Sequence, residues 1–143
     1  MATTATINIT SDITDSISFS INETMTMHKA DGTIDLEETT GLAQRTFSGN
    51  TTQVVLLDVS AIGGLTAGGA VAHKVYIRNT GTDKTQHFKV TLADTTDDTE
   101  EIGRLYGGDW MLFPWLATDA NEDIMVQPSS SEKMTIEYAV FHQ

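Results

Sequence analysis

The chain has 143 residues, and its 20 Asp and Glu residues against 8 Lys and Arg residues give a formal net charge of -12. This length suits one domain built around one hydrophobic core. The charge repels phosphate backbones, so nucleic acid is not an expected partner. The chain contains no cysteine, which excludes disulfides, thiolate metal sites and cysteine nucleophiles.

The sequence also gives no reason to expect a membrane partner. No run of residues approaches the roughly 18 apolar residues of a transmembrane helix. The segment Met1 to Asp12 is rich in Thr and lacks the basic and apolar regions of a signal peptide. We therefore expect synthesis in the cytosol.

The first predicted elements in chain order are strands. The apolar residues there mostly keep one parity, which is the period of a strand, and they are Ile7, Ile9, Ile13, Ile17, Phe19, Ile21, Met25 and Met27. Dense β-branched Thr and Ile favour a pleated strand over a helix. We expect two or three strands, with residues 1–12 forming an N-terminal arm and residues 13–143 forming the domain.

Two further strands are predicted before the middle of the chain. Asp31-Gly32 predicts a tight hairpin turn between Met25–Lys29 and Thr33–Glu37. The short apolar run Val54–Val59 predicts a strand that is covered on both faces. Between them, Gly41–Asn50 has no clear period, so it is interpreted as a connection that places Leu42 and Phe47 in the core.

The glycine-rich segment Gly63–Gly69 predicts an irregular loop. After it, apolar and polar residues alternate from Lys74 to Arg78, and Asn79–Thr82 has the composition of a turn. A strand that carries Phe88, Val90 and Leu92 on one face follows. This arrangement predicts a second hairpin.

The last third of the chain is predicted as a charged loop, Asp94–Glu101, followed by short strands. Gly107-Gly108 predicts a turn, and Pro114 predicts a strand end or an edge because proline lacks a backbone donor. The predicted strands are Ile102–Tyr106, Trp110–Trp115, Ile124–Val126 and Met134–Val140. Some eight to ten short strands without a helix predict an all-β fold, an antiparallel β-sandwich or jelly roll in a single domain.

Two acidic segments are candidates for cation sites. Asp31–Glu38 imitates the second half of an EF-hand loop, but Met27 and Lys29 would occupy its first ligand positions, so a plain turn is the preferred interpretation. The loop 94–101 could gather oxygen ligands around Ca²⁺ or Mg²⁺. Its alternative is a solvated charged loop, and the sequence leaves both open.

No constellation for catalysis emerges from the sequence. The four histidines, His28, His73, His87 and His142, are scattered without a ligand spacing. No Gly-x-Ser-x-Gly elbow and no phosphate-binding Gly-Lys-Ser/Thr motif is present. We therefore predict no enzymatic activity, no catalytic or metal-binding residue and no cofactor.

Aromatic residues gather between Tyr106 and Trp115, where Trp110 and Phe113 also lie. Such clusters form cores and protein contacts, and they can also stack sugars. Core or subunit contact is the preferred interpretation. Phe141 falls on the outward face of the last predicted strand, which suggests that this face also meets a neighbour.

Three segments together resemble small virion proteins of tailed bacteriophages: Lys74–Gly81, Ile102–Trp115 and Ile136–Phe141. The resemblance covers about the second half of the chain. It is closest to the β-sandwich proteins that decorate or cement phage heads, and it carries no active site. It implies a structural protein on the outer surface of the head.

The resemblance predicts a capsid decoration (cement) protein, located in the virion and made in the host cytoplasm. Its expected partners are the major capsid protein or other virion proteins, in a homo-oligomer such as a trimer. A tail or fibre component and a carbohydrate-binding adhesion module are the alternatives. The residues predicted to make contacts are Thr3, Ile7, Ile9, Ile13, Leu65, Tyr106, Trp110, Phe113, Trp115 and Phe141.

Overall fold

The computed structural model describes residues 3–11, 19–28, 38–61, 73–92, 100–117 and 122–142. The described strands are β1 (Thr4–Ser11), β2 (Phe19–Thr26), β3 (Glu38–Thr39), β4 (Ala43–Phe47), β5 (Val54–Leu57), β6 (Lys74–Asn79), β7 (His87–Leu92), β8 (Glu101–Tyr106), β9 (Trp110–Pro114), β10 (Ile124–Pro128) and β11 (Met134–His142). The described residues contain no α-helix. The all-β prediction is confirmed.

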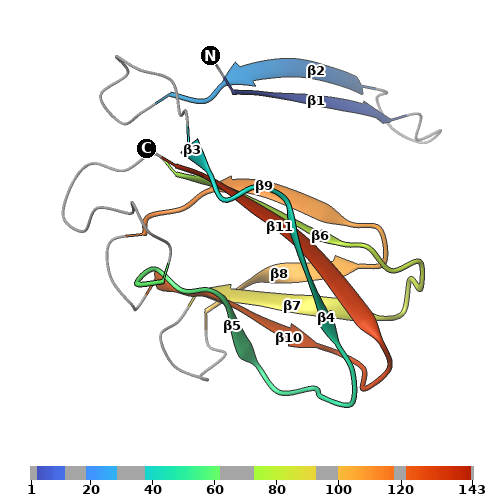
Figure 1. Ribbon diagram of the computed structural model, residues 1–143. Coiled ribbons are helices and arrows are strands. Elements are labelled where there is room, and N and C mark those ends of the chain that lie inside the picture. The colour runs from blue at the N-terminus through green and yellow to red at the C-terminus, as the bar shows by residue number, and fades with distance from the viewer. Residues whose placement is uncertain are drawn as a thin grey trace.

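Strands β3 to β11 form two antiparallel sheets that pack face to face (Figure 1). One sheet has the order β4–β11–β6–β9, with β3 pairing on the same edge of β11 as β4. The other sheet has the order β5–β10–β7–β8. The eight strands β4 to β11, connected in this order across the two sheets, form a jelly roll, so the predicted sandwich is confirmed.

The core lies between the two sheets and follows from strict alternation along the strands. Inward residues are apolar and almost completely buried: Val75, Ile77, Phe88, Val90, Ile124, Val126, Ile136 and Val140. The rings of Phe47 and Phe88 pack with centroids 5.5 Å apart. Because each sheet has one apolar face, the sheets bury these faces against each other.

The predicted second hairpin is wrong. Strand β6 pairs with β9 and β11, whereas β7 pairs with β8 and β10, so the chain crosses between sheets after Asn79. The buried Asn79 side chain donates to the Leu105 carbonyl at 3.0 Å and accepts from the Gly81 amide at 3.0 Å. The polar segment that suggested a hairpin turn therefore makes a crossing.

The segment interpreted as a connection, Gly41–Asn50, contains the edge strand β4. Its Phe47 is buried as predicted, but Leu42 is 67% exposed, so its predicted place in the core is wrong. The physical reason is that Leu42 lies just before β4, an odd number of positions from the inward Phe47, so in extended backbone it points to the other face. Leu56 and Leu57 on β5 are both buried in the core between the sheets, at a register shift in the pairing of β5 with β10. The predicted strand is confirmed, and cover on its outer face stays a prediction.

Some predictions fall outside the described residues. The Asp31-Gly32 turn, the loop 63–69 and positions 94–99 of the acidic loop are among them, as are Ile13 and Leu65. The division into an arm at residues 1–12 and a domain at 13–143 stays a prediction.

The turn that joins β8 to β9 connects the two sheets and depends on two glycines. Gly108 has φ +89, a backbone conformation that side chains rarely adopt. A Cβ atom at Gly107 would overlap the backbone of Asp83. The Gly107 amide donates to the Asp83 carbonyl at 3.2 Å, and Lys84 Nζ donates to the Gly107 carbonyl. The predicted turn is confirmed, and its close backbone approach explains why glycine is needed.

We predict that Gly107→Ala lowers the free energy of unfolding by roughly 1–3 kcal/mol, because the methyl group must displace the Asp83 backbone. Gly103→Ala is the matched control, since a Cβ atom at Gly103 meets nothing within 4 Å. Urea denaturation of both variants checks this. Equal midpoints for the two variants would contradict the proposed close approach.

Candidate functional site

Strands β1 and β2 form a two-stranded ribbon with one apolar and one polar face. The register pairs Ala5 with Met25, Ile7 with Glu23 and Ile9 with Ile21. Because directly opposed residues share a face, these six side chains lie together, and Glu23 is the one charged group among them. The ribbon is therefore amphipathic.

The other face of this ribbon consists of hydroxyl and amide side chains. It pairs Thr4 with Thr26, Thr6 with Thr24, Asn8 with Asn22 and Thr10 with Ser20. The hydroxyl oxygens of Thr6 and Thr24 are hydrogen-bonded at 2.9 Å. Water satisfies such a face, so only the apolar face needs cover.

The ribbon lies beside the sandwich as a separate layer (Figure 1). Its two strands contact each other extensively and make few contacts with the sandwich strands. Ile7, Ile9, Ile21 and Met25 remain 37–42% exposed. The rest of the described chain therefore covers the apolar face of the ribbon incompletely. An isolated two-stranded ribbon is only marginally stable in water, so further cover of this face would stabilise it.

The outer face of the β4–β11–β6–β9 sheet carries a second apolar surface. Tyr76 lies in register between Leu112 on β9 and Ala139 on β11. Trp110, at the β9 edge, is 50% exposed. Phe141 on β11 is half-buried and completes this surface.

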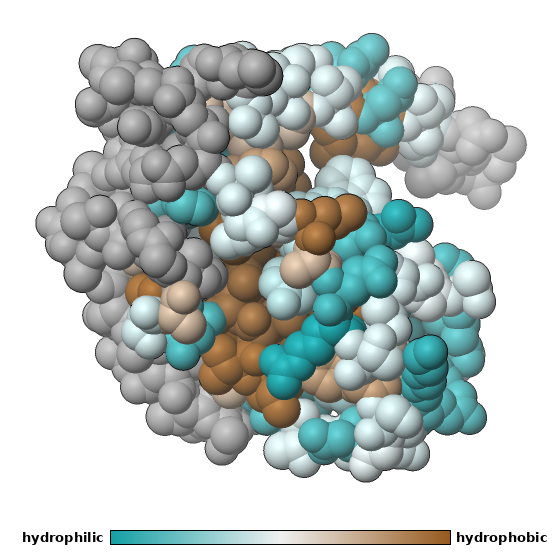
Figure 2. All heavy atoms as spheres, viewed as in Figure 1, coloured by the Kyte–Doolittle hydropathy of each residue, from teal (hydrophilic) through white to brown (hydrophobic). Residues whose placement is uncertain are grey.

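The two apolar surfaces line one groove of about 890 Å³. The ribbon contributes residues such as Ile7, Ile9 and Met25, and the sandwich contributes Tyr76, Trp110, Leu112 and Phe141. Figure 2 shows the hollow between the ribbon and the sandwich, with hydrophobic side chains on the inner side of the ribbon. Met27 also lines the groove and is only 2% exposed. We call this space the ribbon groove.

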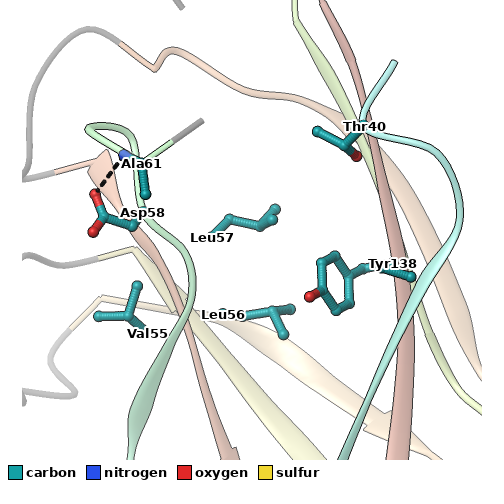
Figure 3. Close-up of a pocket in the computed structure, with 8 residues that line it drawn as sticks. Thr40, Val55, Leu56, Leu57, Asp58, Ala61 and Tyr138 are labelled. Atoms are coloured by element: carbon teal, nitrogen blue, oxygen red, sulfur yellow. Dashed lines mark hydrogen bonds between the residues drawn. The ribbon is translucent and has the colours of Figure 1, made fainter. Parts of the chain in front are cut away.

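A second hollow, of about 430 Å³, opens between the two sheets where β4 and β5 lie at their edges. Figure 3 shows Leu56, Leu57 and Tyr138 directed into it. Asp58 at its rim accepts from the amides of Ser60 and Ala61, at 2.8 and 3.3 Å, which holds the turn after β5. Hydrogen bonds from Ser60 lower the pKa of Asp58. Leu56 and Leu57 are core residues, so this hollow exposes little apolar area.

The structure places the predicted contact residues in several different environments. Ile7, Ile9, Trp110 and Phe141 line the ribbon groove. Trp115 lies in the core, 2% exposed, and its indole nitrogen donates to the Glu122 carbonyl at 2.7 Å. The remaining described candidates lie elsewhere.

Phe113 packs against the core from β9. Tyr106 on β8 packs against His87 on the neighbouring strand β7 of the same sheet, with ring centroids 4.9 Å apart. Thr3 accepts from the Met27 amide through its carbonyl at 2.9 Å, which closes the ribbon. A role of any of these residues in contacts with another molecule stays a prediction.

Sequence reasoning missed the contribution of Tyr76 and Leu112 to the groove. Both are large side chains at outward positions of strands whose inward neighbours, such as Val75 and Ile77, are fully buried. A strand with one face in water alternates apolar with polar residues. Large apolar or aromatic residues at both odd and even positions of a strand therefore indicate that its outer face is also covered, and this signal could have identified Tyr76 and Leu112.

The described residues show no metal centre and no membrane helix. No group of three or more His, Asp or Glu side chains within the described ranges is placed to hold a metal ion. No helix in this part of the chain is long and apolar enough to cross a membrane.

No known family matches the chain, and no curated protein matches it. Among solved structures, the chain is similar to PliG from Aeromonas hydrophila, a periplasmic inhibitor of g-type lysozyme. The TM-score is 0.40 at 16% identity, over 73% of this chain and 86% of that chain. PliG is an enzyme inhibitor rather than an enzyme.

These comparisons contradict the head-decoration interpretation. The matched structure is a periplasmic lysozyme inhibitor and not a virion protein. The predicted capsid function, the major capsid protein or other virion proteins as partners of a homo-oligomer, and the virion location are therefore corrected. The diffuse strand-and-turn pattern behind that resemblance describes a β-sandwich, and one sandwich fold serves many functions. The function has to be argued from the surfaces of this chain.

The core contains an unusual histidine pair. His73 is fully buried, and neither of its ring nitrogens has a hydrogen-bond partner among the described residues. Its ring meets His142 edge-on, with centroids 6.3 Å apart. Burial, followed by the charges of His142 and Lys74, lowers the pKa of His73 below its ordinary value of 6.5. His73 is therefore neutral in the folded protein at neutral pH.

We predict that the protein loses stability as the pH falls below about 6.5. The unfolded chain binds a proton at His73 in this range while the folded chain does not, so stability is full above this pH and declines below it. The slope from this group is at most about 1.4 kcal/mol per pH unit. Urea denaturation between pH 8 and 5.5 measures it. His73→Phe should flatten the slope and the exposed His28→Gln should not; an unchanged slope in His73→Phe would contradict this account.

Proposed function

We propose that this chain is a non-enzymatic protein-binding domain, which holds a positively charged, apolar segment of a partner protein in the ribbon groove. The main supporting observation is that two apolar surfaces line one groove of about 890 Å³, and that several of their side chains stay about 40–50% exposed. Neither surface is covered by the other. A bound segment would supply the missing layer between them.

The energetic support comes from apolar area. Ile9 and Ile21, which face each other across the ribbon, are 41% and 40% exposed, and Trp110 is 50% exposed. Burial of such area stabilises a complex by roughly 25 cal/mol per Å² before the costs of association. A half-buried tryptophan beside large aliphatic side chains is the composition of an interface core.

The charge of the chain supports a basic partner. The net charge is -12, and Glu23 places a carboxylate inside the otherwise apolar ribbon face. A second copy of the chain would bring another charge of -12, which opposes self-association in this groove. Lys and Arg on the partner would be attracted from a distance, and one of them would pair with Glu23.

The geometry supports a segment that is apolar on both sides. A strand that lies between two apolar faces is covered on each side, and such strands carry continuous apolar runs rather than alternating ones. The expected segment therefore has a short continuous apolar run with basic residues at its ends.

The lining of the groove supports binding rather than catalysis. Its polar members are Thr, Asn and Tyr side chains and the single carboxylate of Glu23. The Tyr76 hydroxyl donates to Glu137 at 3.3 Å, and burial, followed by the charge of Glu137, raises its pKa. A tyrosine with a raised pKa stays protonated and is a poor general base.

We predict that a peptide with a Val-Ile-Val-Leu-Val centre and two Lys residues at each end binds and changes the fluorescence of Trp110. The other tryptophan, Trp115, is buried in the core, so the change reports on the groove. Ile9→Asp should weaken binding by roughly tenfold or more, because it places a charge against the apolar segment. Leu116→Asp is the matched control, since Leu116 is 57% exposed and lies outside the groove lining.

Two control peptides sharpen this test. One carries Glu in place of the terminal Lys residues, and the other alternates Lys with Val. Both should bind at least tenfold more weakly than the first peptide. Equal binding of all three, or no loss in Ile9→Asp, would contradict the proposal. Sedimentation that shows a dimer lost in Ile9→Asp would identify a second copy as the occupant instead.

A further inference from the structure

A cluster of hydrogen-bond donors lies on the outer face of the β5–β10–β7–β8 sheet. The ribbon groove is lined by the other sheet and the ribbon. The register aligns Gln127 on β10, Lys89 on β7 and Arg104 on β8 in one row across three neighbouring strands. His87 lies two residues from Lys89 on the same face, opposite Tyr106. With Thr51 and Ser129 these side chains line a hollow of about 340 Å³.

This hollow differs in chemistry from the rest of the chain. Acidic residues outnumber basic ones by 20 to 8, yet no carboxylate is among the residues that line it. The lining offers an ammonium, a guanidinium, an amide, hydroxyls and an imidazole, all of which can donate hydrogen bonds. A donor-rich hollow without a carboxylate attracts an anion.

The two cations of the hollow lie next to each other on neighbouring strands. Lys89 and Arg104 are directly opposed across β7 and β8, and like charges at such positions destabilise a sheet. Glu101 relieves part of this repulsion, because its carboxylate accepts from Arg104 Nε at 2.7 Å and from Nη2 at 3.4 Å. The guanidinium has five N–H donors, of which two are on Nη1. The two bonds to Glu101 involve Nε and Nη2 and do not use the donors of Nη1.

The surrounding groups are held in place by the fold. The Gln127 amide donates to the Thr51 carbonyl at 2.9 Å, and the backbone amide of His87 donates to Ser129 Oγ at 2.8 Å. His87 Nδ1 is buried without a hydrogen-bond partner among the described residues. Its ring packs against Tyr106.

We propose that this hollow binds a small oxyanion, a carboxylate, phosphate or sulfate group, on a molecule of low overall charge. Lys89 and Arg104 supply the charge, and Gln127 and His87 supply further donors. A polyanion is disfavoured, because the net charge of -12 on the rest of the chain repels it. The site does not depend on the ribbon groove.

His87 provides a direct readout of the site. Burial, followed by the charge of Arg104 and with a smaller effect of Lys89, lowers the pKa of His87, and Glu101 acts in the opposite direction. An anion bound between these groups favours the protonated imidazole. Binding should therefore raise the pKa of His87.

The test is an NMR titration of the histidine ring protons between pH 5 and 8, in sodium chloride and in sodium sulfate at equal ionic strength. We expect sulfate to raise the pKa of His87 by on the order of 0.5 unit or more relative to chloride. The exposed His28 in the same spectrum reports the general effect of the salt. Equal shifts at His87 and His28, or no shift at His87 with sulfate and with the two further anions named below, would overturn the proposal.

Variants assign the effect to the hollow. Lys89→Gln and Arg104→Gln should each reduce the sulfate-induced shift at least twofold, and Lys133→Gln, elsewhere on the surface, should not. Glu101→Gln should enlarge the shift, because it removes a competing carboxylate, whereas Glu132→Gln should leave it unchanged. Equal effects of each variant and its control would count against the site.

Acetate and glycerol 3-phosphate, used as probes in the same titration, distinguish the kinds of oxyanion. A shift with acetate alone assigns the site to carboxylates. A shift with sulfate and glycerol 3-phosphate assigns it to tetrahedral oxyanions, and the second probe shows that the group can be carried on a larger molecule. No shift with any of these anions rejects the proposal.

Discussion

A β-sheet with one apolar face has to bury that face, and this constraint organises the whole molecule. The two sheets of the jelly roll satisfy it by packing against each other, which leaves Val75, Ile77, Phe88 and Ile136 completely buried. The β1–β2 ribbon has the same kind of apolar face but no sheet packed closely against it. The outer face of the β4–β11–β6–β9 sheet, with Tyr76 and Trp110, is the surface that it faces across the groove. The proposed function follows from this incomplete burial.

Much of the fold could be predicted from the sequence, because alternating side chains specify strands directly. The pattern Met134, Ile136, Tyr138, Val140 marks β11 almost to its ends. The pairing of strands was harder to predict, because a polar turn such as Asn79 to Thr82 serves equally as a hairpin or as a crossing between sheets. The buried Asn79 side chain settles the crossing through its bond to the Leu105 carbonyl, and this partner is 26 residues away in sequence.

Only part of the candidate site could be predicted from the sequence, because the sequence indicates the strands but not how they pair and pack. Ile7 and Ile9 were predicted as contact residues of the N-terminal segment, Trp110 from the aromatic cluster of its strand and Phe141 from its outward position. All four line the groove. Their meeting in one groove depends on how the ribbon lies against the sandwich. The donor cluster of Lys89, Arg104 and Gln127 depends on the register of three strands, β7, β8 and β10. The mistaken phage interpretation came from a pattern of strands and turns, which reports fold and leaves function undetermined.

Amide hydrogen exchange of the ribbon measures directly how well its apolar face is covered. If the apolar face of β1 and β2 is incompletely covered, these amides open locally at a free energy well below that of global unfolding. The amides of β6 and β11, in the middle of their sheet, should exchange only on global unfolding. We expect the ribbon amides to exchange at least tenfold faster than those of β6 and β11. Their exchange should slow when a segment occupies the groove. Ribbon amides that exchange together with β6 and β11 in the free protein would show that the chain already buries this face, and would contradict the account.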